Sequence, residues 1–98
     1  MTISKKLEGD KLTLALEGRL DTTTAPELDA VVSDSVASVK ELVLDLNKLD
    51  YISSAGLRVL MSAQKKMSTH GCMKVTGVNE TVNEVFEVTG FSDILTIE

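Results

Sequence analysis

Apolar and polar residues alternate strictly along two short segments near the start of the chain, residues 3–7 and residues 12–17. Successive side chains of a strand point to opposite faces, so this alternation predicts two strands, each with one face that looks at solvent. Gly9 and Asp10 lie between the two segments and favour a tight turn. We therefore expect an antiparallel hairpin.

A second pattern, in which apolar residues recur every three or four positions, predicts three helices. Such a stripe lies along one face of an α-helix and is buried against a neighbouring layer. The expected helices cover residues 25–39, residues 54–69 and residues 80–89.

Residues at the ends of these segments indicate where each helix begins and stops. Thr24 and Glu27 have the spacing of a capping box at the start of the first helix. Asn79 is a suitable N-cap for the third helix. Gly71 and Gly90 follow the second and third helices, and both are expected to adopt the left-handed conformation that ends a helix.

A nearly continuous apolar run over residues 42–46 predicts the central strand, because a strand covered on both faces has no polar side. Residues 72–76 read as a further strand, and residues 94–97 could add a short edge strand. The alternation of strands and helices predicts an α/β fold. We expect a single-domain mixed β-sheet of four to five strands, with helices mainly on one face.

The carboxyl ends of parallel strands are where ligands of such sheets usually bind. The loop expected over residues 47–54 lies at that edge, and residues 18–23 join it if their strand runs parallel to the central one.

Composition narrows the class of protein. The chain has 98 residues, of which 43% are hydrophobic and 26% charged, so we expect one domain that spans residues 1–98. Its net charge of −5 argues against a surface for nucleic acid or anionic membranes and favours a partner protein. No apolar run reaches the length of a membrane span and no signal-peptide core follows Met1, so a cytoplasmic location is expected. A single Cys72 and a single His70 predict neither an internal disulfide nor a zinc site.

Two adjacent serines, Ser53 and Ser54, stand where the central strand gives way to the second helix. One of them can act as the N-cap by accepting a hydrogen bond from a helix N–H. The other is then left at an exposed helix start, where the free N–H groups and the helix dipole favour added negative charge. That serine could carry a phosphate without unfolding the helix.

The sequence gives less support to an enzymatic function. The sequence contains no dinucleotide fingerprint, phosphate loop, nucleophile elbow or zinc-protease motif. His70 is expected at the far end of the helix that Ser54 begins, roughly 20 Å away at 1.5 Å per residue, which excludes a Ser-His pair. A group formed by Asp21, Asp45 and Asp50 near Ser54 is a minority interpretation, since aspartates in loops commonly form turns.

These residues resemble the STAS domain of bacterial anti-sigma factor antagonists. The resemblance covers almost the whole chain, and its strongest part is the Ser-Ser-Ala-Gly-Leu stretch between strand and helix. The similar segments are residues 18–21, residues 42–46, residues 50–57, and Phe86 followed by Gly90 and Phe91.

The resemblance implies an anti-sigma factor antagonist that binds an anti-sigma serine kinase and is inactivated when a serine at the helix start is phosphorylated. By position the phosphorylated residue is Ser54, with Ser53 as the alternative, because Ser53 stands where many members have an aspartate. The resemblance also implies a serine phosphatase as a partner, no cofactor, no metal, no catalytic residues and no direct contact with nucleic acid; we expect a monomer. Residues expected to contact the partner are Asp21, Thr22, Ser53, Ser54, Gly56, Leu57, Arg58 and Met61.

Leu57 and Met61 are expected at the margin between the buried and the exposed stripe of the second helix, where a partner could cover them. Three alternative functions stay open. The chain could be a STAS interaction module of a transporter-associated, lipid-handling or signalling-scaffold complex. It could also be a nucleotide-binding domain, or a small hydrolase that uses Ser54 and nearby acids.

Overall fold

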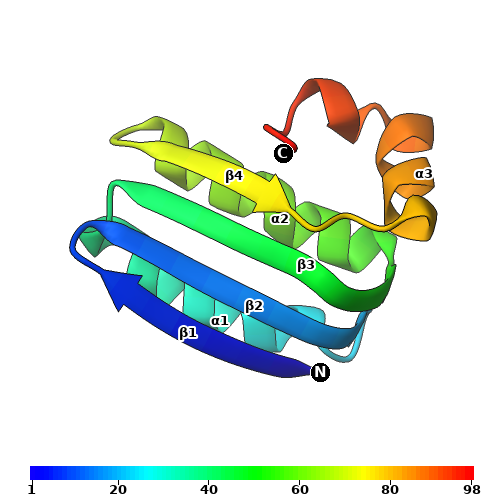
Figure 1. Cartoon of the computed structure of the whole chain (residues 1–98), viewed down its shortest axis with the longest axis horizontal. Helices are drawn as coiled ribbons and strands as arrows, with labels where there is room; N and C mark the ends of the chain where they lie inside the picture. Colours follow the sequence, from blue (N-terminus) through cyan, green and yellow to red (C-terminus); the bar gives the residue numbers. More distant parts are fainter.

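The computed structural model describes all 98 residues. Four strands form one mixed sheet in the order β1-β2-β3-β4, and the helices α1 and α2 lie behind it in Figure 1. The expected α/β architecture is therefore confirmed. The strands are β1 (Thr2–Glu8), β2 (Lys11–Leu20), β3 (Glu41–Ile52) and β4 (Cys72–Thr76); the α-helices are α1 (Ala25–Ser35), α2 (Ser54–Ser68) and α3 (Glu80–Thr89).

Strand β1 pairs with β2 in an antiparallel hairpin around Gly9 and Asp10, as predicted, while β2, β3 and β4 run parallel to one another. The carboxyl ends of the parallel strands therefore meet at one edge of the sheet, which lies on the right in Figure 1. Helix α3 stands beyond this edge. None of the helices combines the length and the apolar character that a membrane-spanning helix needs.

The helix-covered face of the sheet and the apolar stripes of the helices form one core. Leucines that alternate along β2 are fully buried there, and the polar residues between them lie on the opposite face, which no helix covers. Removing this apolar surface from water is the main force that holds the two layers together. The largest fully buried side chains are Leu14, Leu16, Leu20, Leu28, Leu42, Leu44, Leu46, Leu49, Ile52, Leu60, Met67 and Phe86.

The prediction of a loop over residues 47–54 is wrong for most of its length, because β3 continues to Ile52. The register between β2 and β3 shifts twice, and Gly18 adopts a φ of 104° between the shifts. Bulges of this kind break the alternation of side chains. They let Leu49 and Ile52 reach the core, at 0% and 1% exposure, although the sequence pattern around them looks irregular.

Three predicted helix ends differ from the structure. Helix α1 stops at Ser35 and is followed by the short 3-10 helix η1 (Val36–Ser38), so its predicted end at residue 39 is too late. The capping box is also wrong, because the Thr24 side chain makes no capping hydrogen bond. Gly71 is not left-handed; a Cβ there would run into the backbone oxygen of Lys40, so this glycine allows a close approach of two chain segments.

Other ends follow the predictions. The Val82 N–H donates to Asn79 Oδ1 at 2.8 Å, and Gly90 ends α3 with a φ of 80°. The expected edge strand over residues 94–97 is reduced to one bridge between Ile97 and Val75. This pairing still covers the edge of β4, since the Val75 N–H donates to Thr96 O at 2.8 Å.

Candidate functional site

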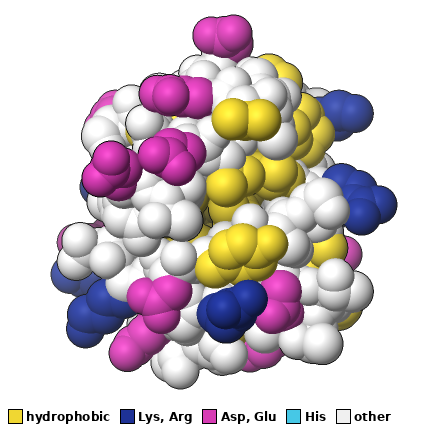
Figure 2. Space-filling view, turned by 90° about the vertical axis from the view of Figure 1, so that its right-hand side faces the viewer, with side chains coloured by type: hydrophobic (Ala, Val, Ile, Leu, Met, Phe, Trp, Pro, Cys, Tyr) yellow, Lys and Arg dark blue, Asp and Glu magenta, His cyan; other side chains and the backbone are white.

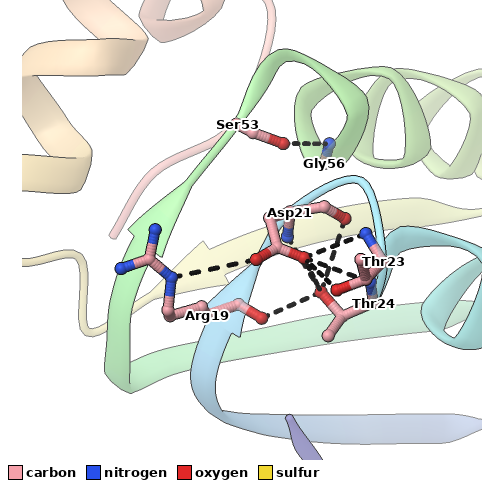
Figure 3. Close-up of polar contacts among 6 residues, drawn as sticks. All are labelled: Arg19, Asp21, Thr23, Thr24, Ser53 and Gly56. Atoms are coloured by element: carbon pink, nitrogen blue, oxygen red, sulfur yellow. Dashed lines mark hydrogen bonds and ion pairs between the residues drawn. The ribbon is translucent and has the colours of Figure 1, made fainter.

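The predicted site lies where β2 and β3 end side by side. Leu20 pairs with Ile52 in the last register position, and the Ser53 N–H donates to Leu20 O at 2.9 Å. This bond ties the start of α2 to the end of β2. It brings the loop that begins with Asp21, the first residue after β2, to the same edge as Ser53, the residue before α2 (Figure 3).

Ser53 and Ser54 have different roles in the fold. Ser53 has extended backbone geometry and is the N-cap of α2; its Oγ accepts a long hydrogen bond of 3.5 Å from the Gly56 N–H. Ser54 is the first residue of α2 and its side chain is exposed. One serine is thus used as a cap, and the hydroxyl of the other faces solvent at the helix start.

Gly56 and Leu57 lie beneath the exposed surface. A Cβ on Gly56 would lie 2.6 Å from Leu20 Cγ and 2.9 Å from Ile52 Cγ1, so glycine lets the first turn of α2 rest on the ends of both strands. Leu57 is only 5% exposed and belongs to the core. The expectation that Leu57 lies at the margin is therefore wrong: it follows Gly56 into the interior, where the first turn meets the sheet.

The exposed residues of α2 continue along one face. Ser54, Arg58 and Met61 are separated by four and three positions, which places them on the same side of a helix. Arg58 is exposed and Met61 is half-buried, as expected for a marginal position. Thr22 is exposed in the loop between β2 and α1.

Asp21 organises the loop between β2 and α1 through its carboxylate. Its Oδ1 accepts the Thr23 hydroxyl at 2.7 Å, the Thr23 N–H at 3.0 Å and the Thr24 N–H at 3.2 Å (Figure 3). The carboxylate thus satisfies backbone donors ahead of α1, whereas the expected capping bond from the Glu27 N–H to the Thr24 hydroxyl is absent. The Thr24 hydroxyl instead donates to Arg19 O at 2.9 Å.

The hydrogen bonds of this loop change the acidity of Asp21. The Thr23 hydroxyl above all, helped by the backbone N–H groups of Thr23 and Thr24, stabilises the carboxylate and lowers the pKa of Asp21 below its ordinary value of 3.8. Desolvation of the carboxylate opposes this shift without reversing it. Asp21 therefore carries a full negative charge at neutral pH.

Arg19 and Tyr51 also belong to this edge, although the sequence pattern did not single them out as site residues. They pair across β2 and β3, and the Arg19 Cζ lies 4.7 Å above the centre of the Tyr51 ring. The Arg19 Nε is 3.8 Å from Asp21 Oδ2. The available signal was their position, because each residue comes two places before a predicted site residue, Asp21 or Ser53.

The other candidate groups lie apart from the site. Asp45 is in the middle of β3, and its Oδ1 accepts the Asn47 N–H at 3.0 Å, so a cluster of Asp21, Asp45 and Asp50 does not form. His70 follows the carboxyl end of α2, where its Nε2 is 2.7 Å from Val36 O. The His70 imidazole is therefore too far from Ser54 to act as its general base.

Comparison with known proteins agrees with this fold. The model of the STAS domain matches residues 2–98. The chain is 36% identical to BtrV of Bordetella bronchiseptica, which is classed as an anti-sigma factor antagonist, over 94% of this chain and 80% of BtrV. It is 32% identical to the anti-sigma-B factor antagonist of Listeria monocytogenes, over 96% of this chain and 84% of the relative.

Solved structures show the same fold. An anti-sigma factor antagonist from Mycobacterium paratuberculosis superimposes with a TM-score of 0.89 at 23% identity, over 98% of this chain and 83% of that structure. The Bacillus cell fate determinant SpoIIAA in its phosphorylated form gives a TM-score of 0.78 at 15% identity, over 99% of this chain and 91% of that structure. With the family match and the relatives above, these findings show that the chain belongs to the STAS-domain family of anti-sigma factor antagonists.

Proposed function

We propose that this protein is an anti-sigma factor antagonist that binds an anti-sigma serine kinase and is inactivated when that kinase phosphorylates Ser54. The observation that carries the proposal is the division of roles between the two serines. Ser53 caps α2, whereas the Ser54 hydroxyl is exposed at the first position of the helix. A kinase can reach Ser54 without unfolding the domain.

The proposed contact surface is the edge that contains the Asp21 loop and the start of α2. Its exposed or half-buried members come from both segments, and Gly56 and Leu57 support them from below. The members are Asp21, Thr22, Ser53, Ser54, Arg58 and Met61.

The effect of phosphorylation follows from electrostatics. A phosphate adds about −1.5 to −2 charges at pH 7, and the N–H groups at the start of α2 together with the helix dipole stabilise those charges in the free protein. A docked kinase experiences the opposite effect, because the phosphate adds bulk and negative charge to an edge that already contains the Asp21 carboxylate. Phosphorylation is therefore expected to weaken binding and to leave the fold intact.

The comparisons support this proposal through the names of the similar proteins. The Listeria relative is an anti-sigma-B factor antagonist, and SpoIIAA is a structural neighbour with a phosphorylated form. On this basis we propose a binding protein, not an enzyme, that acts as a monomeric single domain in the cytoplasm. A serine phosphatase would restore the binding form by removing the phosphate from Ser54.

Phosphopeptide mapping tests the choice of serine. Incubation with an anti-sigma serine kinase and ATP should label Ser54 in the wild-type protein and in Ser53→Ala, and should leave Ser54→Ala unlabelled. Ser53→Ala is expected to lose roughly 0.5 to 2 kcal/mol of stability because it removes a cap. A phosphate found chiefly on Ser53 would overturn the assignment to Ser54.

Titration calorimetry with the same kinase tests the switch. Ser54→Ala should bind about as tightly as the wild-type protein, and the phosphorylated protein should bind much more weakly. Ser54→Asp should lie between them, because one carboxylate has less charge and fewer oxygens than a phosphate. Equal affinity for all four proteins would contradict the proposal.

A further inference from the structure

The only tyrosine of the chain lies on the surface, at the edge that contains Ser54. The chain has three aromatic residues; Phe86 is completely buried and Phe91 is half-buried, whereas 37% of Tyr51 is exposed. An aromatic ring contributes most to stability when it is buried in the core. Core packing therefore does not account for the placement of Tyr51.

Arg19 holds one face of this ring. Its guanidinium lies 4.7 Å from the ring centre, within the range of a cation–π contact, and its Nε is 3.8 Å from Asp21 Oδ2. The Arg19 side chain is nevertheless 64% exposed. The Arg19 guanidinium thus lies between the Tyr51 ring and the Asp21 carboxylate and remains open to solvent. We call Arg19 and Tyr51 the edge pair.

The edge pair continues the proposed contact surface. Tyr51 lies three residues before Ser54, and Arg19 lies two residues before Asp21. Figure 2 views this edge of the molecule directly and shows apolar side chains through its middle, acidic side chains at the upper left, and a basic side chain between acidic ones below the apolar strip. Asp50 is exposed next to Tyr51 in the chain. The surface therefore offers an apolar ring beside carboxylates.

Tyrosine and arginine are, with tryptophan, the side chains that most often dominate the binding energy of protein interfaces, because they combine a large contact area with polar groups. Here the contacts with Asp21 restrict the arginine before binding, which reduces the ordering cost that binding has to overcome. Asp21 is paired with Arg19, but Asp50 is exposed and the chain has a net charge of −5, which favours a partner surface with cationic residues. Charge complementarity therefore points to a basic partner surface with an apolar position for the ring.

We propose that the edge pair is the affinity anchor for the anti-sigma kinase, and that the kinase covers Tyr51 with an apolar position surrounded by Lys or Arg residues. This inference rests on the proposed function, because it names the residues through which the same partner is held. Ser54 then regulates an interface whose binding energy comes mainly from its neighbours. Arg19 is a positioning residue that orients the Tyr51 ring.

The test is titration calorimetry with the anti-sigma serine kinase that binds the wild-type protein. Tyr51→Ala should raise the Kd by about tenfold or more, as expected for an interface hot spot, and Tyr51→Phe should stay close to wild type because the ring and its stack remain. Arg19→Ala should raise the Kd by a smaller factor. Leu7→Ala is the matched control, because Leu7 is a 63% exposed apolar residue of β1 that pairs with Leu12, at the opposite end of the sheet.

A double-mutant cycle distinguishes positioning by Arg19 from an independent contact. If Arg19 acts through the ring, its removal should change the Kd much less in the Tyr51→Ala background than in the wild-type protein. Circular dichroism melts of each variant establish that the fold is retained, and Arg19→Ala together with Tyr51→Phe gives the readout if Tyr51→Ala unfolds. Additive effects of the two alanine substitutions would overturn the positioning role.

The remaining outcomes separate this inference from the proposed function. If the wild-type protein binds the kinase and phosphorylation weakens binding, but Tyr51→Ala changes the Kd less than twofold, only the anchor is overturned. If no anti-sigma kinase binds the wild-type protein, the proposed function fails and the anchor fails with it. If sedimentation shows a wild-type dimer that Tyr51→Ala converts to monomer, the edge pair contacts a second copy and the kinase assignment is wrong.

Discussion

The Asp21 loop at the carboxyl edge and the last turns of the helices at the opposite end of the sheet hold side chains in different ways. At the carboxyl edge, the hydrogen bonds of Asp21 and Thr24 join residues within five positions of each other in the chain. At the opposite end, where α1 and α2 finish, the bonds join distant segments: Lys66 Nζ donates to Ser33 Oγ at 3.0 Å, and His70 Nε2 is 2.7 Å from Val36 O.

This difference separates the carboxyl edge, which is free to bind a partner, from the opposite end of the sheet, which we call the structural end. The Asp21 loop satisfies its own backbone donors, so it holds its shape without covering Ser54 or Tyr51, and both side chains stay available to a partner. At the opposite end, the side chains of Lys66 and His70 connect α2 and the turn after it with α1 and η1. We therefore expect changes at the opposite end to affect stability alone, and changes at the carboxyl edge to affect binding as well.

The largest effect on stability is expected at the structural end, from Gly71→Ala. The added Cβ would run into Lys40 O, a backbone atom that also accepts the Cys72 N–H at 3.0 Å. Because backbone atoms cannot move aside as a flexible side chain can, we expect a loss of about 3 kcal/mol in the free energy of unfolding. Urea denaturation measures it, with Ser68→Ala as an exposed control expected to change by less than about 0.5 kcal/mol. A loss of less than about 1 kcal/mol would show that the backbone around Gly71 and Lys40 can accommodate a Cβ atom.

Asp21→Ala should have the next largest effect on stability and should also act on binding. It removes the acceptor for the Thr23 hydroxyl and for the backbone N–H groups of Thr23 and Thr24 in the loop ahead of α1, so the free energy of unfolding should fall. Asp50→Ala is the matched control for stability, since Asp50 is an exposed acid at the same edge. Urea denaturation and kinase titration together give the result; equal stability of both variants would show that the loop does not depend on the carboxylate.

His70→Ala tests whether the structural end affects stability alone. A carbonyl oxygen only accepts hydrogen bonds, so His70 Nε2 donates to Val36 O, and its loss should cost about 0.5 to 1.5 kcal/mol. Kinase affinity should stay at the wild-type value, because the bond lies at the end of α2 that is remote from Ser54. A weaker affinity in a folded His70→Ala protein would mean that the structural end contributes to the interface.

The smallest expected effect is a change in the acidity of Asp21. Thr23→Val removes the hydroxyl that contributes most to the lowered pKa, so the pKa of Asp21 should rise toward 3.8 while the loop stays folded. A carboxyl group with a lowered pKa in the folded state adds stability above its unfolded pKa and loses it as the pH falls through the folded value. The variant should therefore have less of this stabilisation above the unfolded pKa, and the loss should be complete at a higher pH than in the wild-type protein. NMR titration of the Asp21 side chain measures the shift, and an unchanged pKa would assign the effect to the backbone donors.

Local patterns along the chain were sufficient for most of the fold. The alternation in residues 3–7 and 12–17 predicted the hairpin, and the three- and four-residue spacings predicted all three helices. The same patterns placed two serines at the start of α2, one as cap and one exposed, and the structure has that arrangement. These features depend on the backbone period and on caps within a few residues, so the sequence by itself determines them.

The tertiary structure decided the features that depend on which strands pair and how closely segments approach. Two register shifts extend β3 to Ile52, and the first turn of α2 takes Leu57 into the core. The close approach of Lys40 gives Gly71 a role that differs from a helix cap. Pairing of β2 with β3 also brings Arg19 onto Tyr51, residues separated by a helix and most of a strand in the chain. No local period encodes such contacts, because each is set by the relative positions of segments that meet only after the sheet has formed.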